Sequence, residues 1–445
     1  MNRPRSWLAA GLIGGTIVRA LALPTSGTGD VGIWKVWSFG ASHDALGVYG
    51  VGGVPPERRV LQWQGDEMTV DYPPLAIAEL AVVGRVYARL DRGFHDTPTL
   101  NAFVKLPGLI AEVVLVVVLL TWGTELLGRP RAAWTALAVW LNPLVILNGS
   151  LLGYLDAQMA VPLVLAIMTA WANLSTMAGA LFAVAVLTKA QAIFAGPPLL
   201  AILAVRSDSW RRPARAVIGG GVVTAATVLP YVLHGAWTNL VQALGRLATH
   251  DMLSAQAANI WWVFTWVLRV ADVHGEWGWW PALTQEVQIL KISRAVALGY
   301  PDARTVGLFL VALAIGWACW QVRHGLTLGR AAAISGWSLY AYAMLAAQVH
   351  ENHWYAAVML FALAAGADHR YRATFWALTA IAALNLYLFY GMVAGWHSGL
   401  NRHWTGIDAT LVLSVVNFAV FCRAGWLLAT DPASTGAVRK PAPSV

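Results

Sequence analysis

Charged residues are scarce in this chain of 445 residues, since Asp, Glu, Lys and Arg together make up 12% of it, against roughly 25% in soluble domains. Hydrophobic residues account for 58%, and the mean hydropathy is +0.59. This composition excludes a soluble globule, a disordered chain and a collagen-like repeat. The two cysteines, Cys319 and Cys422, stand in apolar segments, so a disulfide scaffold is excluded as well.

Two absent motifs narrow the chemistry. The sequence has no Gly-rich phosphate loop of the Walker type and no Gly-x-Ser-x-Gly nucleophile elbow, which disfavours nucleotide-driven transport and serine hydrolysis. Lys and Arg outnumber Asp and Glu by 30 to 22, and in a membrane protein this excess predicts basic cytoplasmic loops rather than binding to nucleic acid. The 24 tryptophans predict broad loops at the membrane interface.

Apolar runs of about 20 residues recur along the chain and predict an all-α polytopic membrane protein of roughly 10–13 transmembrane helices, with a single domain over residues 1–430. The first helix is expected from Trp7 to about Pro24, uncleaved and with its N-terminus in the cytoplasm, although Ala20-Leu21-Ala22 also resembles a signal-peptide cleavage site. Further spans are expected at 73–90, 103–126, 131–149, 157–173, 177–205 (one span or a pair), 213–234, 305–322, 330–347, 353–366, 373–392 and 408–428.

Basic clusters set the predicted orientation in the plasma (inner) membrane. Arginines gather at 206–215, 323–330 and 370–372, and all three loops are expected in the cytoplasm. Loops 25–72 and 235–300 and the turn 348–353 then lie on the extracytoplasmic side. Arg129 and Arg131 fit this scheme poorly.

The two long loops exceed the 12–15 residues typical of simple connections and are rich in Trp and apolar residues. Both are expected to fold onto the membrane surface, and the stretch from Val31 to Phe39 would suit an interfacial helix. The segment 431–445, rich in Pro, Ala and Ser, is expected to be a disordered cytoplasmic tail.

Charged groups near membrane depth are costly, so each is a functional candidate. The candidates are Asp30, Asp71, Lys105, Glu112, Asp156, Lys189, His350, Glu351 and His353. Asp30 precedes an aromatic run, where a carboxylate could accept a proton from a substrate hydroxyl while the aromatics shape a pocket. The alternative is that Asp30 caps the following helix, and Asp71, just before Pro73-Pro74, has the same alternative.

Three further segments combine polar residues with apolar surroundings. Asn142-Pro143 and the stretch from Gly153 to Gln158 interrupt the helical pattern, which is tolerated at this depth only where the backbone lines protein or a wet cavity. Lys189 requires an anionic partner, either a substrate phosphate or a structural carboxylate. In the turn after Val349, His350, Glu351 and His353 could hold a metal, but the spacing is not that of zinc proteases, so hydrogen bonding to sugar or phosphate is expected.

Taken in order, these motifs resemble the GT-C superfamily of glycosyltransferases, polytopic enzymes that use polyprenyl-phosphate sugars. The matching segments are Gly29-Asp30 with Trp37, Asp71-Tyr72-Pro73-Pro74-Leu75, Asn142-Pro143 with Gly153 to Gln158, Thr188-Lys189-Ala190-Gln191, Asn259-Ile260-Trp261-Trp262 and Val349-His350-Glu351-Asn352. Their order is that of the dolichyl-phosphate-glucose-dependent branch. Tyr154-Leu155-Asp156 departs from the Gln-Tyr-Asn of that branch and is closer to bacterial mannosyltransferase-like members.

The resemblance implies a GT-C-like fold and an inverting hexosyltransferase. Mannose or glucose would pass from a polyprenyl-phosphate sugar to a lipid-linked or extracytoplasmic glycan acceptor, with Asp30 as the base. It implies no cofactor or metal, and partners limited to donor, acceptor and membrane lipids. The residues expected to bind donor or acceptor are Trp34, Lys35, Trp37, Asp71, Tyr72, Asp156, Gln158, Lys189, Asn259, Trp261, His350, Glu351 and His353.

Two other functions are compatible with intramembrane charges. A transporter or flippase of lipid-linked sugars would line its route with them, but paired broken helices in two halves are not evident in the sequence. A scaffold protein would have little reason to keep a carboxylate, a lysine and a His-Glu pair at costly depths. The sequence therefore favours the enzyme.

Overall fold

The computed structural model describes residues 3–50, 59–207, 209–247, 249–271, 286–392 and 406–430. These residues are mostly helical, with one short antiparallel hairpin of β1 (Leu61–Trp63) and β2 (Asp66–Met68). The tail predicted at 431–445 and part of each long loop lie outside the described residues. The mostly helical architecture agrees with the predicted fold class.

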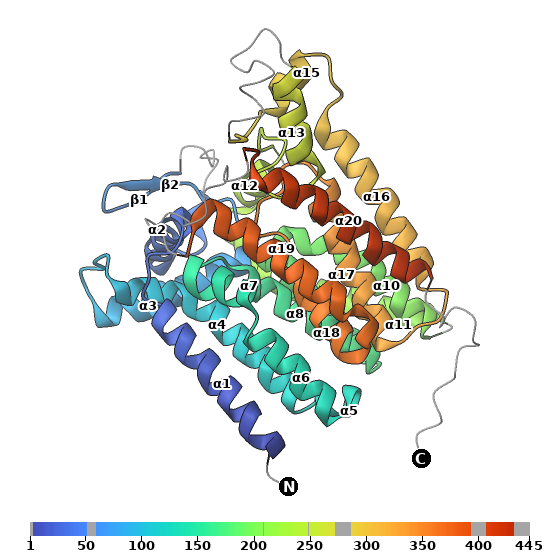
Figure 1. The fold of residues 1–445 in the computed structure, drawn as a ribbon. Helices are drawn as coiled ribbons and strands as arrows, with labels where there is room; N and C mark the ends of the chain where they lie inside the picture. The colour runs from blue at the N-terminus through green and yellow to red at the C-terminus, as the bar shows by residue number, and fades with distance from the viewer. Residues whose placement is uncertain are drawn as a thin grey trace.

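Membrane-length helices form the body of the molecule (Figure 1). Among the described residues, six segments are long and apolar enough to cross a bilayer: Pro98–Leu120, Arg129–Leu152, Arg211–Leu233, Ala303–Gln321, His369–Tyr390 and Ala409–Ala429. Shorter apolar helices stand between them: Ser6–Ala22, Asp156–Trp171, Ser175–Thr188, Ala190–Val205 and Tyr355–Ala367. A chain with this many apolar helices is a multi-pass membrane protein.

The bundle and its loops comprise the following helices. The long elements are α1 (Arg3–Ala22), α4 (Pro98–Leu120), α6 (Arg129–Trp140), α8 (Asp156–Trp171), α9 (Ser175–Thr188), α10 (Gly196–Val205), α11 (Arg211–Leu233), α16 (Ala303–Gln321), α17 (Leu328–Leu345), α18 (Tyr355–Ala367), α19 (Arg372–Tyr390) and α20 (Ala409–Ala429). The loop and connecting elements are α2 (Gly29–His43), η1 (Gly47–Tyr49), α3 (Pro74–Leu90), α5 (Gly123–Leu127), α7 (Pro143–Val145), η3 (Ile146–Leu152), η4 (Ala190–Ala195), α12 (Trp237–Leu247), α13 (Ile260–Ala271), α15 (Ile292–Ala297) and η5 (His369–Tyr371).

The described parts of both long loops and the 348–353 turn meet at one end of the bundle, which we call the loop end. Arg246 of α12 donates a hydrogen bond to the carbonyl of Val70, at 2.7 Å. The amide of Ala255 donates to the carbonyl of Val349, at 2.9 Å. Figure 1 shows the start of α1 and the end of α20 on the opposite side of the molecule from α2, α12 and α15. The sequence prediction that these three segments share one face therefore agrees with the structure.

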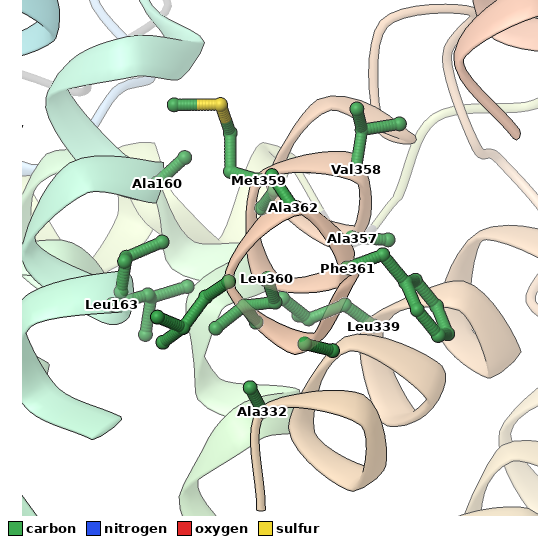
Figure 2. Close-up of a cluster of buried hydrophobic side chains, with 14 of the residues drawn as sticks. Ala160, Leu163, Ala332, Leu339, Ala357, Val358, Met359, Leu360, Phe361 and Ala362 are labelled. Carbon is green, nitrogen blue, oxygen red and sulfur yellow. The ribbon is translucent and has the colours of Figure 1, made fainter. Parts of the chain in front are cut away.

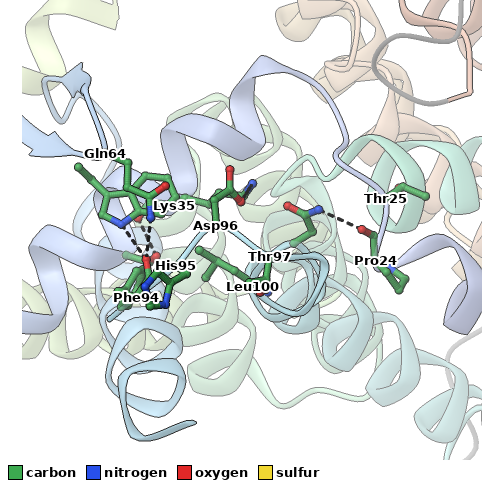
Figure 3. Close-up of polar contacts among 12 residues, drawn as sticks. Pro24, Thr25, Lys35, Gln64, Phe94, His95, Asp96, Thr97 and Leu100 are labelled. Atoms are coloured by element: carbon green, nitrogen blue, oxygen red, sulfur yellow. Dashed lines mark hydrogen bonds and ion pairs between the residues drawn. The ribbon is translucent and has the colours of Figure 1, made fainter. Parts of the chain in front are cut away.

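Helix α3 does not cross the bundle, so the span predicted at 73–90 is wrong. It packs beside α2, with Gly84 against the backbone of Ser38. The chain beyond it is still at the loop end, because Asp96 pairs with Lys35 and Asn101 donates to the carbonyl of Pro24 (Figure 3).

Without a crossing at 73–90, Arg129 and Arg131 no longer conflict with the predicted membrane orientation. With α4 as the next crossing after α1, these arginines fall at the end opposite the loop end. There Arg131 donates to the carbonyl of Ala367, at 3.2 Å, and the Arg372 guanidinium lies over the ring of Trp134. The basic residues at 129–131 and 370–372 thus share one face, as a common orientation requires.

The core of the bundle is built from α8, α17 and α18 (Figure 2). Helix α18 is apolar all round and nearly every residue in it is buried, which is the pattern of a helix enclosed by others. Its Leu360 lies toward Leu163 of α8, whereas the Phe361 ring points to the other side of α18 (Figure 2). Many of its remaining positions are Ala or Gly, which lets neighbouring backbones approach closely.

Candidate functional site

A cavity of about 960 Å³ lies at the loop end. Segments distant in sequence enclose it: the start of α2, the stretch before α3, the α9–η4 junction, the 250–256 stretch, the start of α16 and the 346–353 turn. Its polar lining residues are Thr28, Asp30, Thr69, Asp71, Tyr72, Tyr154, Lys189, Gln191, His250, Gln256, Arg304, Tyr342, Gln348, His350, Glu351, Asn352, His353 and Tyr390. The cavity therefore gathers candidates from most of the motifs.

Asp30 lines this cavity from the first turn of α2. The N-cap of that helix is Thr28, and the Asp30 carboxylate accepts no hydrogen bond from the described residues, so the capping alternative is not what the structure shows. Burial raises the pKa of Asp30 from 3.8 to about 6; Glu351 adds to the rise, and Lys189 opposes it. An unpartnered carboxyl group with a pKa near neutrality is suited to accept a proton.

Three aromatic rings form the wall beside Asp30. The ring centroids of Trp34, Trp37 and Tyr72 are 5.0 to 5.4 Å apart, and the rings are mutually tilted. The Trp34 indole donates to the carbonyl of Gly153, at 3.0 Å. Gly153 has a φ of +82°, and a Cβ there would meet Val31 at 2.4 Å, so a residue other than glycine would be strained. This wall presents apolar ring surface to the cavity.

Asp71 also lines the cavity, on the side of the first loop. The N-cap of α3 is Pro73, with no capping hydrogen bond from a side chain, so Asp71 is not a cap either. Burial raises its pKa, against the opposing charges of His250 and Arg246. Asp71 is thus a second carboxyl group that faces the cavity.

Lys189 occupies a break between two apolar helices. Helix α9 ends at Thr188, Lys189 is extended (φ −149°, ψ 116°), and the chain continues into η4 and α10. The stretch 177–205 is therefore a pair of segments, which was one of the two alternatives. The Lys189 ammonium lines the cavity and donates to Asp156 Oδ1, at 2.5 Å. The structural-carboxylate alternative for Lys189 is thus realised, with the ammonium still facing the cavity.

The turn before α18 supplies two imidazoles and a carboxylate to the cavity. Tyr154 donates to Glu351 Oε1, at 2.6 Å, and Tyr342 lies 3.1 Å from His353 Nδ1. Burial, with the nearby charge of Lys189, lowers the pKa of His350 to about 4, so its imidazole is neutral at pH 7. His350 is then a hydrogen-bond donor or acceptor rather than a cation.

The predicted absence of a metal stays a prediction. Within the described ranges no three His, Cys, Asp or Glu side chains are grouped as metal ligands would be. The His350 and His353 rings lie 5.5 Å apart between centroids, while the Glu351 carboxylate is engaged by Tyr154.

Five predicted binding residues do not line the cavity. Lys35 pairs instead with Asp96, at 2.7 Å (Figure 3). Gln158 packs against Gly108, and Asp156 is fully buried behind Lys189. Asn259 and Trp261 donate to the carbonyls of Ala343 and Leu345 and so tie the start of α13 to α17. These five side chains contact other parts of the protein and do not line the cavity.

Two of the cavity residues, Arg304 and Tyr390, were not predicted from the sequence. Arg304, at the start of α16, lies 3.7 Å from Asp251 and donates to the carbonyl of His250. Tyr390, at the end of α19, donates to the side chain of Gln256. A charged residue just inside a span, directly after a long loop, was the available signal for Arg304. Nothing local marks Tyr390.

No protein-family model matches this chain, and no curated protein matches its sequence. The likeness to GT-C enzymes rests on the motifs and their order.

Proposed function

We propose that this protein is an integral membrane inverting glycosyltransferase. It moves a hexose, mannose or glucose, from a polyprenyl-phosphate sugar to a lipid-linked or extracytoplasmic glycan acceptor. The site faces the extracytoplasmic side of the plasma (inner) membrane. The observation that carries this proposal is the Asp30 carboxylate, which lines the cavity without a hydrogen-bond partner in the described chain and has a pKa of about 6.

In the proposed reaction Asp30 activates the acceptor, while Lys189 and His350 bind the leaving phosphate. Asp30 takes the proton of an acceptor hydroxyl as its oxygen attacks the anomeric carbon of the donor. The bond from that carbon to the phosphate oxygen breaks, and the leaving phosphate keeps the electron pair. The Lys189 ammonium and a neutral His350 donate hydrogen bonds to the developing phosphate charge. Attack opposite the leaving group inverts the anomeric centre, and a phosphate leaves without a general acid.

The apolar flank of the cavity supports a lipid-linked donor. Ile193 of η4 and Leu308 of α16 line the cavity and are each more than half exposed, and Ile289, which also lines it, is exposed as well. Apolar side chains that face outward at a membrane helix are compatible with acyl or isoprenoid chains. A sugar phosphate could thus lie inside while its lipid chain stays in the bilayer.

The test is a transfer assay with the purified full-length protein. Radiolabelled polyprenyl-phosphate mannose and polyprenyl-phosphate glucose are each supplied with a membrane lipid extract as acceptor. Wild type is compared with Asp30→Asn and with Asp66→Asn, which makes the same change at an exposed position of β2. We expect transfer of one sugar by wild type and Asp66→Asn, and its loss in folded Asp30→Asn.

The other outcomes decide against parts of the proposal. Equal transfer by Asp30→Asn and wild type would exclude Asp30 as the base. Movement of the labelled lipid across liposome bilayers without any transfer would favour a flippase instead.

A further inference from the structure

Asp156 connects three side chains from different segments. Its Oδ1 accepts the hydrogen bond from Lys189, at 2.5 Å, and its Oδ2 accepts from the amides of Asn148 and Asn352, each at 3.0 Å. These partners come from η3, the α9–η4 break and the 346–353 turn. Asp156 itself is fully buried and does not line the cavity.

The two asparagines depend on Asp156 for their orientation. The side-chain oxygens of Asn148 and Asn352 are buried and have no hydrogen-bond partner in the described chain. Their amide nitrogens therefore make the contacts that fix these side chains. A buried carboxylate with three donors is well satisfied, and losing it would leave all three unpaired.

Lys189 retains donors for a ligand. An ammonium has three N–H groups, and the described residues engage one of them, through Asp156. The side chain is 7% exposed and lies on the cavity wall beside Tyr72, with the ammonium 6.0 Å from the ring centroid. Its remaining N–H groups are therefore available at the cavity, in a direction that the bond to Asp156 restricts.

We propose that Asp156 is a positioning residue that holds Lys189 and the 350–353 turn as one anion-binding unit. This inference rests on the proposed function for its ligand, the phosphate group of a polyprenyl-phosphate donor. The Asp156 carboxylate offsets the charge of the ammonium, so the unit binds through the placement of its donors rather than through net charge. Binding is then sensitive to the geometry that Asp156 imposes.

The experiment measures binding rather than turnover. Full-length protein in detergent is titrated with polyprenyl phosphate, which carries no sugar, and separately with inorganic phosphate, using microscale thermophoresis. The variants are Asp156→Asn, Lys189→Met, the double variant and Asp156→Glu. The control is Lys105→Met, which removes another buried lysine, one whose ammonium is bound by carbonyls of Thr25, Ser150 and Leu151.

We expect each single variant at Asp156 or Lys189 to weaken binding of polyprenyl phosphate at least ~10-fold, as for loss of a charge-assisted hydrogen bond. The double variant is expected to bind no more weakly than Lys189→Met, because Asp156 acts through Lys189. Asp156→Glu should recover part of the affinity, and Lys105→Met should retain wild-type affinity. Measurable binding of inorganic phosphate would assign the affinity to the headgroup; binding of the lipid alone would show that the chain contributes as well.

Additive losses in the double variant, or wild-type affinity in Asp156→Asn, would overturn the inference. Should Asp156→Asn fail to fold, Asn148→Ala removes one partner of Asp156 away from the cavity, and we expect a loss of about threefold; an unchanged affinity would count against the proposal. Polyprenyl phosphate that binds through Asp156 without sugar transfer would contradict the proposed function only. Transfer that needs Asp30 but is indifferent to Asp156 would contradict only this inference.

Discussion

Replacing Asp30 with asparagine should stabilise the protein at neutral and alkaline pH. The pKa of Asp30 rises from 3.8 to about 6 in the folded protein, chiefly through burial. Since one pKa unit corresponds to about 1.4 kcal/mol, ionised Asp30 costs the folded state about 3 kcal/mol. Asparagine has a similar shape and carries no charge, so it removes this cost, and the carboxylate has no hydrogen bond in the described chain to lose.

The difference in stability between Asp30→Asn and wild type depends on pH. Between pH 4 and pH 6 folded Asp30 holds a proton that the unfolded chain has released, so wild-type stability falls as pH rises through this window. Asp30→Asn should match wild type below pH 4, gain between pH 4 and pH 6, and keep a constant advantage above pH 6. Thermal unfolding of purified protein in detergent should show a Tm higher by a few degrees at pH 8.

The matched control is Asp66→Asn, whose carboxylate is exposed on β2 and whose loss should leave Tm nearly unchanged at every pH. A Tm of Asp30→Asn that equals or falls below that of wild type at pH 8 would refute the reasoning. A gain of the same size at pH 4 and pH 8 would also refute it, because the cost would then not be one of ionisation. The assay needs no substrate.

Three further predictions concern the same site. Transfer should decline below about pH 6, where Asp30 becomes protonated. In pH–rate profiles the pH of this decline should fall in Glu351→Gln and rise in Lys189→Met, because each variant removes a charge that shifts the pKa of Asp30. Gly153→Ala should destabilise by about 1–3 kcal/mol, measured as a lower Tm, because its φ of +82° strains any side chain. Lys35→Met should cost less than about 1 kcal/mol and leave the KM for donor unchanged, since its partner is half exposed.

The sequence was sufficient for the fold class but not for every crossing. The stretch at 73–90 is rich in apolar residues, yet α3 stays at the loop end beside α2. What decides this is the position of Asp96 and Asn101, which pair with Lys35 and the carbonyl of Pro24. Such pairings join residues more than 60 positions apart, and no local pattern shows them.

Helical periodicity could have separated the binding residues on α2. Residues 30, 34 and 37 follow the spacing of one helix face, whereas residue 35 turns away from it. The structure agrees, because Asp30, Trp34 and Trp37 line the cavity and Lys35 does not. The partner of Lys189 was harder to predict, because Asp156 lies on another helix, 33 residues earlier. Predicting that a buried charge needs a partner does not identify which residue supplies it.

Helix α18 is an apolar helix that other helices enclose, so high hydropathy does not mean contact with lipid. Although α18 is apolar along its whole length, the surrounding helices shield it, while α11 and α16 carry many exposed apolar side chains such as Val222 and Phe309. A photoactivatable lipid probe in reconstituted membranes should therefore label peptides from α11 and α16 and leave those from α18 unmodified. This labelling map would report how the bundle sits among its lipids without knowledge of any ligand.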